Sequence, residues 1–211
     1  MKGLLGLIKH SMPAQAADGA AADTFFFSTA FADQGAGASP PVPWEARANE
    51  VGARRLPAAR GAKLLQGLWG KEHYMARLGQ DGVQRLERYL DFASLPAQRD
   101  VIRQDEHGGF MLVLLSGSMA VDREQPWGER LHLTEARPGD ILGEMSLLDG
   151  GVRFSVCTSL TDCEIAVLGA QALDEMMGAD PALAASLIAL LARKLSRRLR
   201  AVSARLNDNT G

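Results

Sequence analysis

Cysteine is scarce in this sequence, and so are aromatic residues and long apolar runs. Only two cysteines occur among 211 residues, and both lie in apolar, strand-like stretches, SVCTSL and DCEIAV. We expect buried free thiols in a reducing compartment, with a hairpin disulfide as the alternative. No run approaches the ~20 apolar residues of a membrane span. The apolar part of the start, MKGLLGLIKHSMPAQAA, is too short for a normal secretion signal, so a cytoplasmic location is expected.

The chain also lacks an excess of either charge, because the formal net charge is only −2. This balance argues against a protein coated in nucleic acid. The chain has no His-x-His pair of the kind that cupin metal centres need, no zinc-like cysteine spacing and no G-x-S-x-G nucleophile motif. The four histidines are scattered: His10, His73, His107 and His132. We therefore predict no catalytic residue, no metal site and no enzyme.

The first 62 residues are rich in Ala, Gly and Pro, with GAGASPPVP in the middle. Such composition buries too little apolar surface to offset its ordering entropy, so 1–62 is predicted to be a mostly disordered arm. One island, TFFFSTAF at 24–31, interrupts it. The island is consistent with a strand or patch that docks on the domain, or with a linear motif for a protein partner.

Residues 63–178 have the texture of a folded β domain. Short helices are expected around Leu64–Trp69 and Val83–Leu90, followed by short strands that glycine turns separate. FMLVLL (110–115) is apolar throughout and predicts a buried strand. RLHLTE alternates, which predicts that Leu131 and Leu133 point inward. The pattern indicates a mainly β fold with flanking helices, an antiparallel β-roll of the jelly-roll type.

Residues 179–211 predict one long helix. Asp180 and Pro181 supply an N-cap and a first-turn proline. Apolar residues then form one stripe that a small barrel cannot cover alone, which predicts a homodimer through 183–206. The stripe comprises Leu183, Leu187, Leu191, Leu195, Leu199, Val202 and Leu206. The basic residues Arg193, Lys194, Arg197, Arg198, Arg200 and Arg205 fall mostly on the other face and are interpreted as solvated, with polyanion binding as the alternative.

The stretch ILGEMSLLDGGVRFS (141–155) combines residues that suit a sugar phosphate. Gly143 allows close backbone approach, and Glu144–Leu148 could form one helical turn whose free N–H groups face an anion. Glu144 suits a sugar hydroxyl, and Arg153 offers a planar cationic fork for phosphate oxygens. The alternative is an internal Glu144–Arg153 ion pair that caps a loop.

Residues 64–206 resemble the cyclic nucleotide-binding domain of the catabolite activator and kinase regulatory-subunit superfamily. The resemblance rests on FMLVLLSGSMAV, which is similar to the family's strand–Ser-Gly–strand segment, on RPGDILGEMSLLDGGVRFS, which is similar to its phosphate-binding cassette, and on the long helix that follows. It implies that Glu144 binds a ribose 2′-hydroxyl, that Arg153 binds the cyclic phosphate, and that the N–H groups of Ser146 and Phe154 assist. The ligand-binding set that it implies is Gly143, Glu144, Met145, Ser146, Arg153, Phe154, Ser155 and Ser203.

Several positions depart from the family pattern. Phe154 stands where the family has a small residue, and its ring could crowd the phosphate. Asp100 and Asp105 take turn positions that are commonly glycine, which aspartate tolerates. Val202-Ser203 replaces a Thr-Ser pair that touches adenine in the family, so the base contact is reduced to Ser203.

These features predict a non-enzymatic sensor of a cyclic nucleotide, with cyclic AMP as the expected ligand and no cofactor. Because the chain ends at Gly211, the resemblance predicts no helix-turn-helix and no DNA-binding domain. The bound state would pass to an unknown protein partner through the N-terminal arm or the dimer helix. The alternative is a degenerate module that binds another ligand, such as cyclic di-GMP, or none, and acts in docking or assembly.

Overall fold

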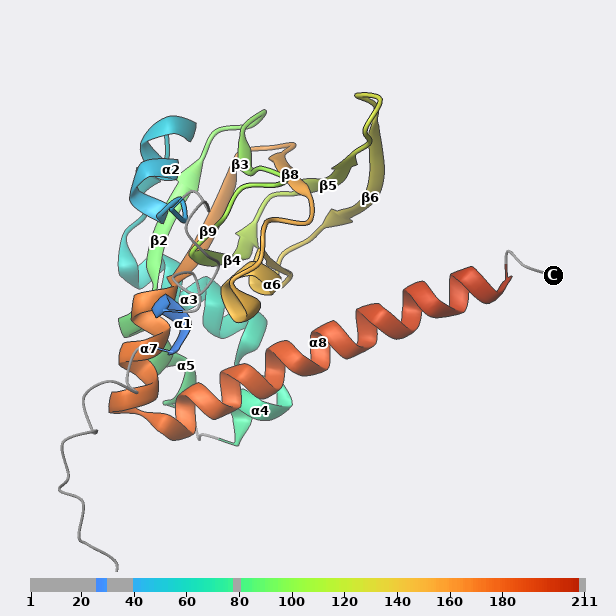
Figure 1. The fold of residues 1–211 in the computed structure, drawn as a ribbon. Helices are drawn as coiled ribbons and strands as arrows, with labels where there is room; N and C mark the ends of the chain where they lie inside the picture. The colour runs from blue at the N-terminus through green and yellow to red at the C-terminus, as the bar shows by residue number, and fades with distance from the viewer. Residues whose placement is uncertain (1–25, 30–39, 78–80, 209–211) are drawn as a thin grey trace, which may run out of the picture.

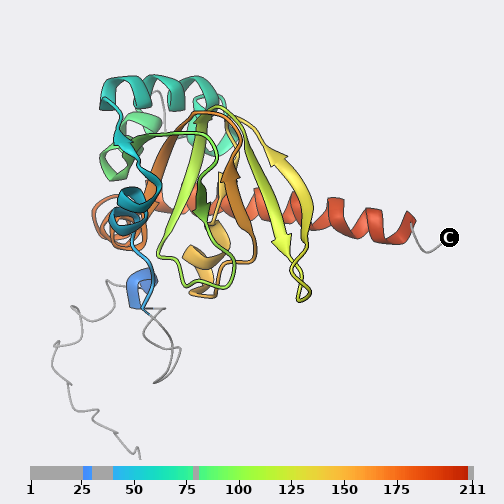
Figure 2. The same ribbon diagram turned by 90° about the horizontal axis from the view of Figure 1, so that it is seen from above.

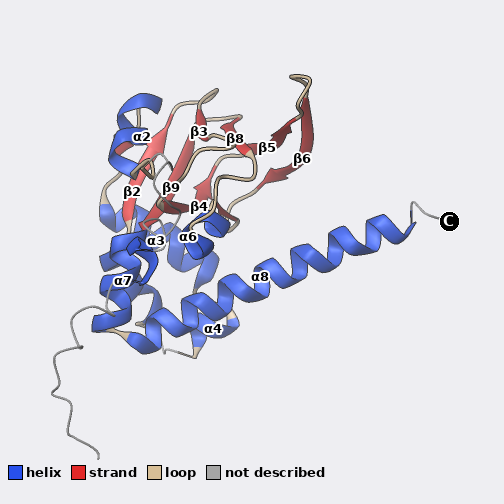
Figure 3. Ribbon diagram, viewed as in Figure 1, coloured by secondary structure: helices blue, strands red, loops and turns tan. Residues whose placement is uncertain are grey.

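The computed structural model describes residues 26–29, 40–77 and 81–208. Two antiparallel sheets form a β-roll, helices gather at one end of it, and a long helix leads away to the C-terminus (Figure 1, Figure 3). This architecture confirms the predicted fold class. The described elements in chain order are α1 (Phe26–Thr29), α2 (Trp44–Val51), β1 (Arg54–Arg55), α3 (Ala58–Trp69), α4 (His73–Ala76), α5 (Gly82–Leu86), the 3-10 helix η2 (Glu87–Tyr89), β2 (Asp91–Leu95), β3 (Asp100–Ile102), β4 (Phe110–Ser116), β5 (Met119–Glu124), β6 (Arg130–Ala136), β7 (Ile141–Leu142), α6 (Glu144–Asp149), β8 (Val156–Ser159), β9 (Cys163–Gly169), α7 (Ala170–Ala179) and α8 (Pro181–Asp208).

The strand order is not sequential, which is what makes the fold a roll. One sheet runs β1-β2-β9-β4-β7 and the other runs β3-β8-β5-β6. The final strand, β9, lies between β2 and β4 and pairs antiparallel with both. Seen from above, the two sheets curve around a shared interior (Figure 2). The cassette helix α6 lies between β7 and β8 in the chain, at the point where the backbone passes from one sheet to the other.

Strand β4 shows why its sequence is apolar at every position. Leu112 and Leu114 belong to the core between the two sheets. Met111 and Val113 belong to a second core, which the sheet shares with the helices. Both faces of β4 are therefore buried, as the continuous apolar run predicts.

Helix α3 packs closely on the first sheet. A Cβ at Gly61 would lie 2.2 Å from the ring of Phe92 on β2, so the contact requires glycine. Leu65 and Trp69 are fully buried, and Trp69 Nε1 donates a hydrogen bond to the Gly139 carbonyl oxygen (3.3 Å). The helix thus reaches the turn that leads into the cassette.

The structure differs from the composition-based prediction for residues 40–62, which contain α2, β1 and the first turn of α3 rather than a disordered arm. Trp44, Val51 and Leu56 are buried. These few apolar side chains suffice because the β-roll supplies a preformed surface, which a count of residue types within the segment does not register.

The phenylalanine island docks on the domain, but as a short helix instead of a strand. Phe27 is buried, and its N–H donates to Asp174 Oδ1 on α7 (2.8 Å). Phe26 is exposed and contacts the Phe27 ring edge-on at 5.1 Å. Phe25 and Phe31, like residues 1–25 and 30–39 of the predicted arm, lie outside the described residues.

The prediction that Leu131 and Leu133 point inward is wrong. Leu131 is 54% exposed, and of strand β6 only Ala136 is buried. The reason is topological, because β6 is the edge strand of its sheet and pairs only with β5. The hairpin extends past the roll (Figure 1), so no second layer covers either face.

Helix α8 begins as the sequence predicts, since Asp180 Oδ1 accepts the Leu183 N–H (3.2 Å). Its first half, however, is covered within the same chain. Leu183, Leu187 and Leu191 are fully buried in the core that α4, α5 and α7 complete. Only the distal part of the stripe, from Leu195 onward, is left for a second molecule; the side chain of Leu206 lies outside the described set.

Replacing a buried and an exposed leucine by alanine compares how much the core and the edge strand contribute to stability. Leu114→Ala should lower the free energy of unfolding by about 2–5 kcal/mol, because Leu114 is fully buried between the sheets. Leu131→Ala should change it by less than about 0.5 kcal/mol. Urea unfolding followed by circular dichroism gives both values. Equal losses would show that β6 is packed against something in solution.

Candidate functional site

The residue immediately before the cassette helix α6 must be glycine. Gly143 has φ +77°, a left-handed conformation that side chains disfavour. A Cβ there would also lie 2.5 Å from Nη1 of Arg153. The sequence thus starts α6 with Glu144 and leaves space for the Arg153 side chain beside the helix start.

Arg153 occupies that space, and its guanidinium is inside the protein. The residue is 3% exposed; Nη1 donates to the Gly143 carbonyl oxygen (2.7 Å) and Nη2 to the Phe110 carbonyl oxygen (2.6 Å). The group also lies over the Phe110 ring, 4.6 Å from its centroid. Across the described ranges, no carboxylate lies within ion-pair distance of Arg153.

Burial weakens the base, but not enough to discharge it at neutral pH. The pKa of Arg153 is lowered to about 10, chiefly by loss of hydration; the neighbouring charge of Arg47 also lowers it, whereas Cys157, Glu106 and Glu144 raise it. The guanidinium has five N–H donors, of which the two carbonyl bonds use two. A buried cation with spare donors and only neutral partners suits an anion.

Glu144 is buried as well, at 4% exposure, and its partner is not Arg153. Glu144 Oε1 accepts a hydrogen bond from Arg198 Nη1 on α8 (2.8 Å). Arg198 also donates to the Ile141 carbonyl oxygen (3.4 Å), and Lys194 Nζ donates to the Gly139 carbonyl oxygen (3.0 Å). The internal Glu144–Arg153 pair that the sequence left open is absent, and the cassette is instead tied to the C-terminal helix.

Phe154 turns its ring away from this buried centre. The side chain is half exposed, and the Arg123 guanidinium stacks on the ring at 4.2 Å from its centroid. Arg123 Nη1 also donates to the Phe154 carbonyl oxygen (2.7 Å). The Phe154 ring thus stacks on Arg123, which adds a second cation on this side of the cassette.

Comparison with known proteins identifies the family. Residues 92–180 match the sequence profile of the cyclic nucleotide-binding domain family. These residues belong to that family. The match runs from Phe92 on β2 to the end of α7 and contains Glu144 and Arg153 of the cassette.

The cyclic nucleotide-binding domain has curated relatives among bacterial regulators. The chain is 29% identical over 115 residues to a CRP-like cAMP-activated global transcriptional regulator of Mycobacterium tuberculosis, which covers 54% of this chain and 51% of the relative. It is 31% identical over 107 residues to the cyclic AMP receptor protein of Thermus thermophilus, covering 51% and 50%. The chain thus spans about half the length of the curated relatives it matches.

A solved structure supports the fold over a longer stretch. A cyclic nucleotide-binding domain from Methylobacillus flagellatus superposes with a TM-score of 0.67, covering 72% of this chain and 86% of that one, at 23% identity. At this identity the likeness concerns the fold.

The remaining residues of the predicted ligand-binding set are spread around the cassette. Ser146 is buried within α6, and Met145 is exposed beside it. Ser155 lies close to the Cys157 thiol and lowers its pKa, against the larger effect of burial. Ser203 is exposed on α8, about 7.5 Å further along the helix than Arg198. The structure therefore brings Gly143, Glu144 and Arg153 together but leaves Ser203 on a part of α8 that leads away from the roll (Figure 1).

Sequence reasoning missed Arg198, Lys194 and Arg123. The first two were interpreted as part of a solvated basic face. Their spacing of four residues places them on one side of a helix, which is the available signal, but nothing in the sequence says that this side meets the cassette. Arg123 lies on β5, and Phe154 immediately precedes β8, the neighbouring strand of the same sheet; this contact follows only from the fold.

Asp105 and Asp100, which stand where the family commonly has glycine, differ in backbone conformation. Asp105 has φ +64° and takes the left-handed turn that the substitution was expected to tolerate. Asp100 is instead the first residue of β3, where it accepts hydrogen bonds from Thr158 Oγ1 (2.5 Å) and Arg130 Nη2 (3.3 Å).

The described part of the chain lacks the features of a metal site and of a membrane span. No three His, Cys, Asp or Glu residues there are arranged to hold a metal ion, and no helix there is long and apolar enough to cross a bilayer. Two surface hollows, one beside Cys163 and Glu164 and one beside Trp44 and Glu175, contain no cassette residue. Glu144 and Arg153 are buried, so the charged centre of the cassette is closed to solvent.

Cys157 should be chemically silent in the folded protein. Both cysteines are free and buried, as predicted, and burial raises the pKa of the Cys157 thiol to about 12. Because the thiolate is the reactive form, iodoacetamide at pH 8 should leave Cys157 unmodified, by mass spectrometry of digested protein. In guanidinium chloride the same residue should react fully. Rapid modification of the native protein would mean that the core around Cys157 opens to solvent.

Proposed function

We propose that this protein is a non-enzymatic regulator that binds a cyclic nucleotide, with cyclic AMP as the first candidate, and passes its bound state to a protein partner. The observation that carries the proposal is the buried guanidinium of Arg153. Holding a charged group in the interior without an ionised partner costs several kcal/mol. A ligand phosphate would supply the missing negative charge and accept the spare N–H donors.

Glu144 supports the same ligand at its sugar end. Arg198 uses only Oε1, so Oε2 can accept a ribose hydroxyl while the ion pair persists. The relatives from M. tuberculosis and T. thermophilus carry cyclic AMP in their names, which favours that nucleotide here.

The closed cassette suggests how binding could be transmitted. Glu144 and Arg153 are almost inaccessible, and Lys194 and Arg198 attach α8 across the cassette edge. Entry of a ligand therefore requires the cassette or α8 to move. In the proposed mechanism the position of α8 reports occupancy to the partner.

The distal part of α8 supports a homodimer, which we propose in revised form. Leu199 and Val202 are exposed, Leu195 is partly exposed, and the three share one side of the helix. Contact between two copies would bury them. The dimer contact proposed here is thus confined to residues from 195 onward, in place of 183–206.

A degenerate module remains the second candidate, and the closure itself favours it. If Arg198 and the carbonyl oxygens satisfy the cassette permanently, the domain would serve docking or assembly, or would hold a different ligand such as cyclic di-GMP. Cytoplasmic location is part of both proposals.

Calorimetric titration with cyclic AMP, cyclic GMP and cyclic di-GMP tests the ligand. Wild type should bind cyclic AMP, and Arg153→Gln should weaken binding at least about tenfold, because it removes charge-assisted bonds to the phosphate. Arg130→Gln is the matched control; it removes an arginine from the surface of β6 and should change affinity less than about twofold.

Two results would contradict the cyclic AMP proposal. If wild type binds none of the three nucleotides at millimolar concentration, the sensor function is wrong. If only cyclic di-GMP binds, the second candidate replaces the first.

Light scattering tests the dimer at micromolar concentration. Leu199→Glu with Val202→Glu should yield monomers, because each buried side chain of this size contributes roughly 1.5–3 kcal/mol. Ala201→Glu with Ala204→Glu adds the same charge about 200° away around the helix from Leu199 and Val202 respectively, and should leave the dimer intact. A monomeric wild type would refute this contact.

A further inference from the structure

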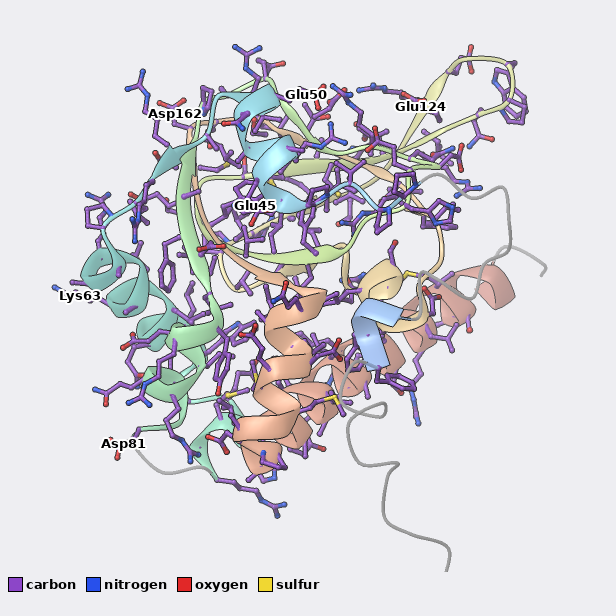
Figure 4. The ribbon with its side chains drawn as sticks, turned by 60° about the vertical axis from the view of Figure 1, so that its left-hand side comes forward. Glu45, Glu50, Lys63, Asp81, Glu124 and Asp162 are labelled. Atoms are coloured by element: carbon purple, nitrogen blue, oxygen red, sulfur yellow. The ribbon has the colours of Figure 1, made fainter. Side chains whose placement is uncertain are left out.

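Residues 42–50, which precede the family match, lie against the loop that supports Arg153. The Val42 N–H donates to the His107 carbonyl oxygen (2.8 Å), and Val42 forms a parallel β-bridge with Gly108. The Trp44 ring meets the Phe110 ring edge-on at 5.5 Å. Helix α2 thereby covers one side of the roll next to this loop (Figure 4, where Glu45 and Glu50 are labelled on α2).

Arg47 is the buried centre of this contact. Its side chain is 2% exposed, Nη1 donates to Glu50 Oε2 (2.6 Å), and Nη2 donates to Glu106 Oε2. Arg103 joins the same two carboxylates from the loop side, but its own side chain is nearly half exposed. The network fixes Glu106 to α2.

The loop that contains Glu106 binds both the N–H and the carbonyl group of Arg153. The Arg153 N–H donates to the Glu106 carbonyl oxygen (2.8 Å), and the Asp105 N–H donates to the Arg153 carbonyl oxygen (2.9 Å). Further along, a Cβ at Gly108 would lie 2.0 Å from Arg153 Nε, so the backbone there forms a wall of the arginine slot. Phe110 supplies the acceptor and the ring beneath the guanidinium.

The N-terminal segment therefore touches each structure that shapes the slot. Arg47 holds Glu106, Val42 bridges Gly108, and Trp44 packs on Phe110. Arg47 also brings a second buried cation near Arg153, close enough to lower the Arg153 pKa after the larger effect of burial. Glu106, which pairs with Arg47, raises the same pKa, so the contribution of this network to phosphate binding is the geometry that it sets.

We propose that Arg47 is a positioning residue for the phosphate-binding arginine: through Glu106 it sets the 105–108 loop and thereby the place of the Arg153 guanidinium. The inference rests on the proposed function for its ligand but not for its geometry. It assigns part of the site to a segment outside residues 92–180.

A ligand-free measurement tests the geometry first. In protein with ¹⁵N-labelled arginine, Arg153→Gln assigns the Arg153 Nε–Hε signal by its loss. Arg47→Gln should shift or broaden this signal, whereas Arg103→Gln, which alters the exposed arginine of the same network, should leave it in place. An unchanged Arg153 signal in Arg47→Gln overturns the inference, whether or not any nucleotide binds.

A double-mutant cycle tests the consequence for binding. Arg47→Gln should weaken cyclic AMP binding about tenfold, and Arg103→Gln less than about twofold. In the Arg153→Gln background, Arg47→Gln should add less than about twofold, because there is no guanidinium left to position. Additive losses in the cycle would mean a general structural role and would overturn the inference.

A second variant guards against misfolding of Arg47→Gln. Glu106→Gln breaks the same link at a partly exposed residue and should reproduce the shift of the Arg153 signal. Arg47→Lys, which keeps the charge but loses the fork between two carboxylates, should give a smaller shift. A folded Glu106→Gln variant with an unmoved Arg153 signal also refutes the proposal. If the signal moves but wild type binds no nucleotide, the proposed function fails and the positioning role stands.

Discussion

The burial of one guanidinium constrains the whole cassette. Arg153 needs acceptors for its N–H groups and room for its plane, and it obtains both from backbone: two carbonyl oxygens, and two glycines whose Cβ atoms would collide with it. This explains why a glycine opens the stretch that an arginine closes. It also explains why the start of α6 and the turn before β4 lie side by side. A cation kept inside without a carboxylate partner carries a desolvation cost, which the phosphate of the proposed ligand would offset.

Around that centre the cassette is held from two directions. Arg198 and Lys194 attach it to α8 through Glu144 and the turn before β7. On the other side, Arg47 attaches the 105–108 loop to α2. The sugar end of the proposed ligand site is thus in contact with the C-terminal helix, and the phosphate end is linked to the N-terminal segment. A change in ligand occupancy would therefore alter contacts of both segments.

Much of this could be predicted where the cause is local. The apolar run of β4, the glycine before Glu144 and the Asp180 cap of α8 each follow from a few adjacent residues, and the cassette pattern led to the family. Other features depend on which element packs against a residue, and adjacent residues do not encode that. Examples are the exposure of Leu131, the burial of Leu187 and the formation of helix α2. The Glu144–Arg198 pair joins residues 54 positions apart, so the sequence indicated a charged site but not its partner.

In the proposed function, Arg153 binds the phosphate of the ligand. The most direct test is a titration of ¹⁵N-arginine-labelled protein with cyclic AMP, with adenosine as the ligand that lacks the phosphate. We predict that the Arg153 Nε–Hε signal shifts saturably with cyclic AMP and stays in place with adenosine at equal concentration. Saturable binding of cyclic AMP that leaves the Arg153 signal unmoved would contradict the account.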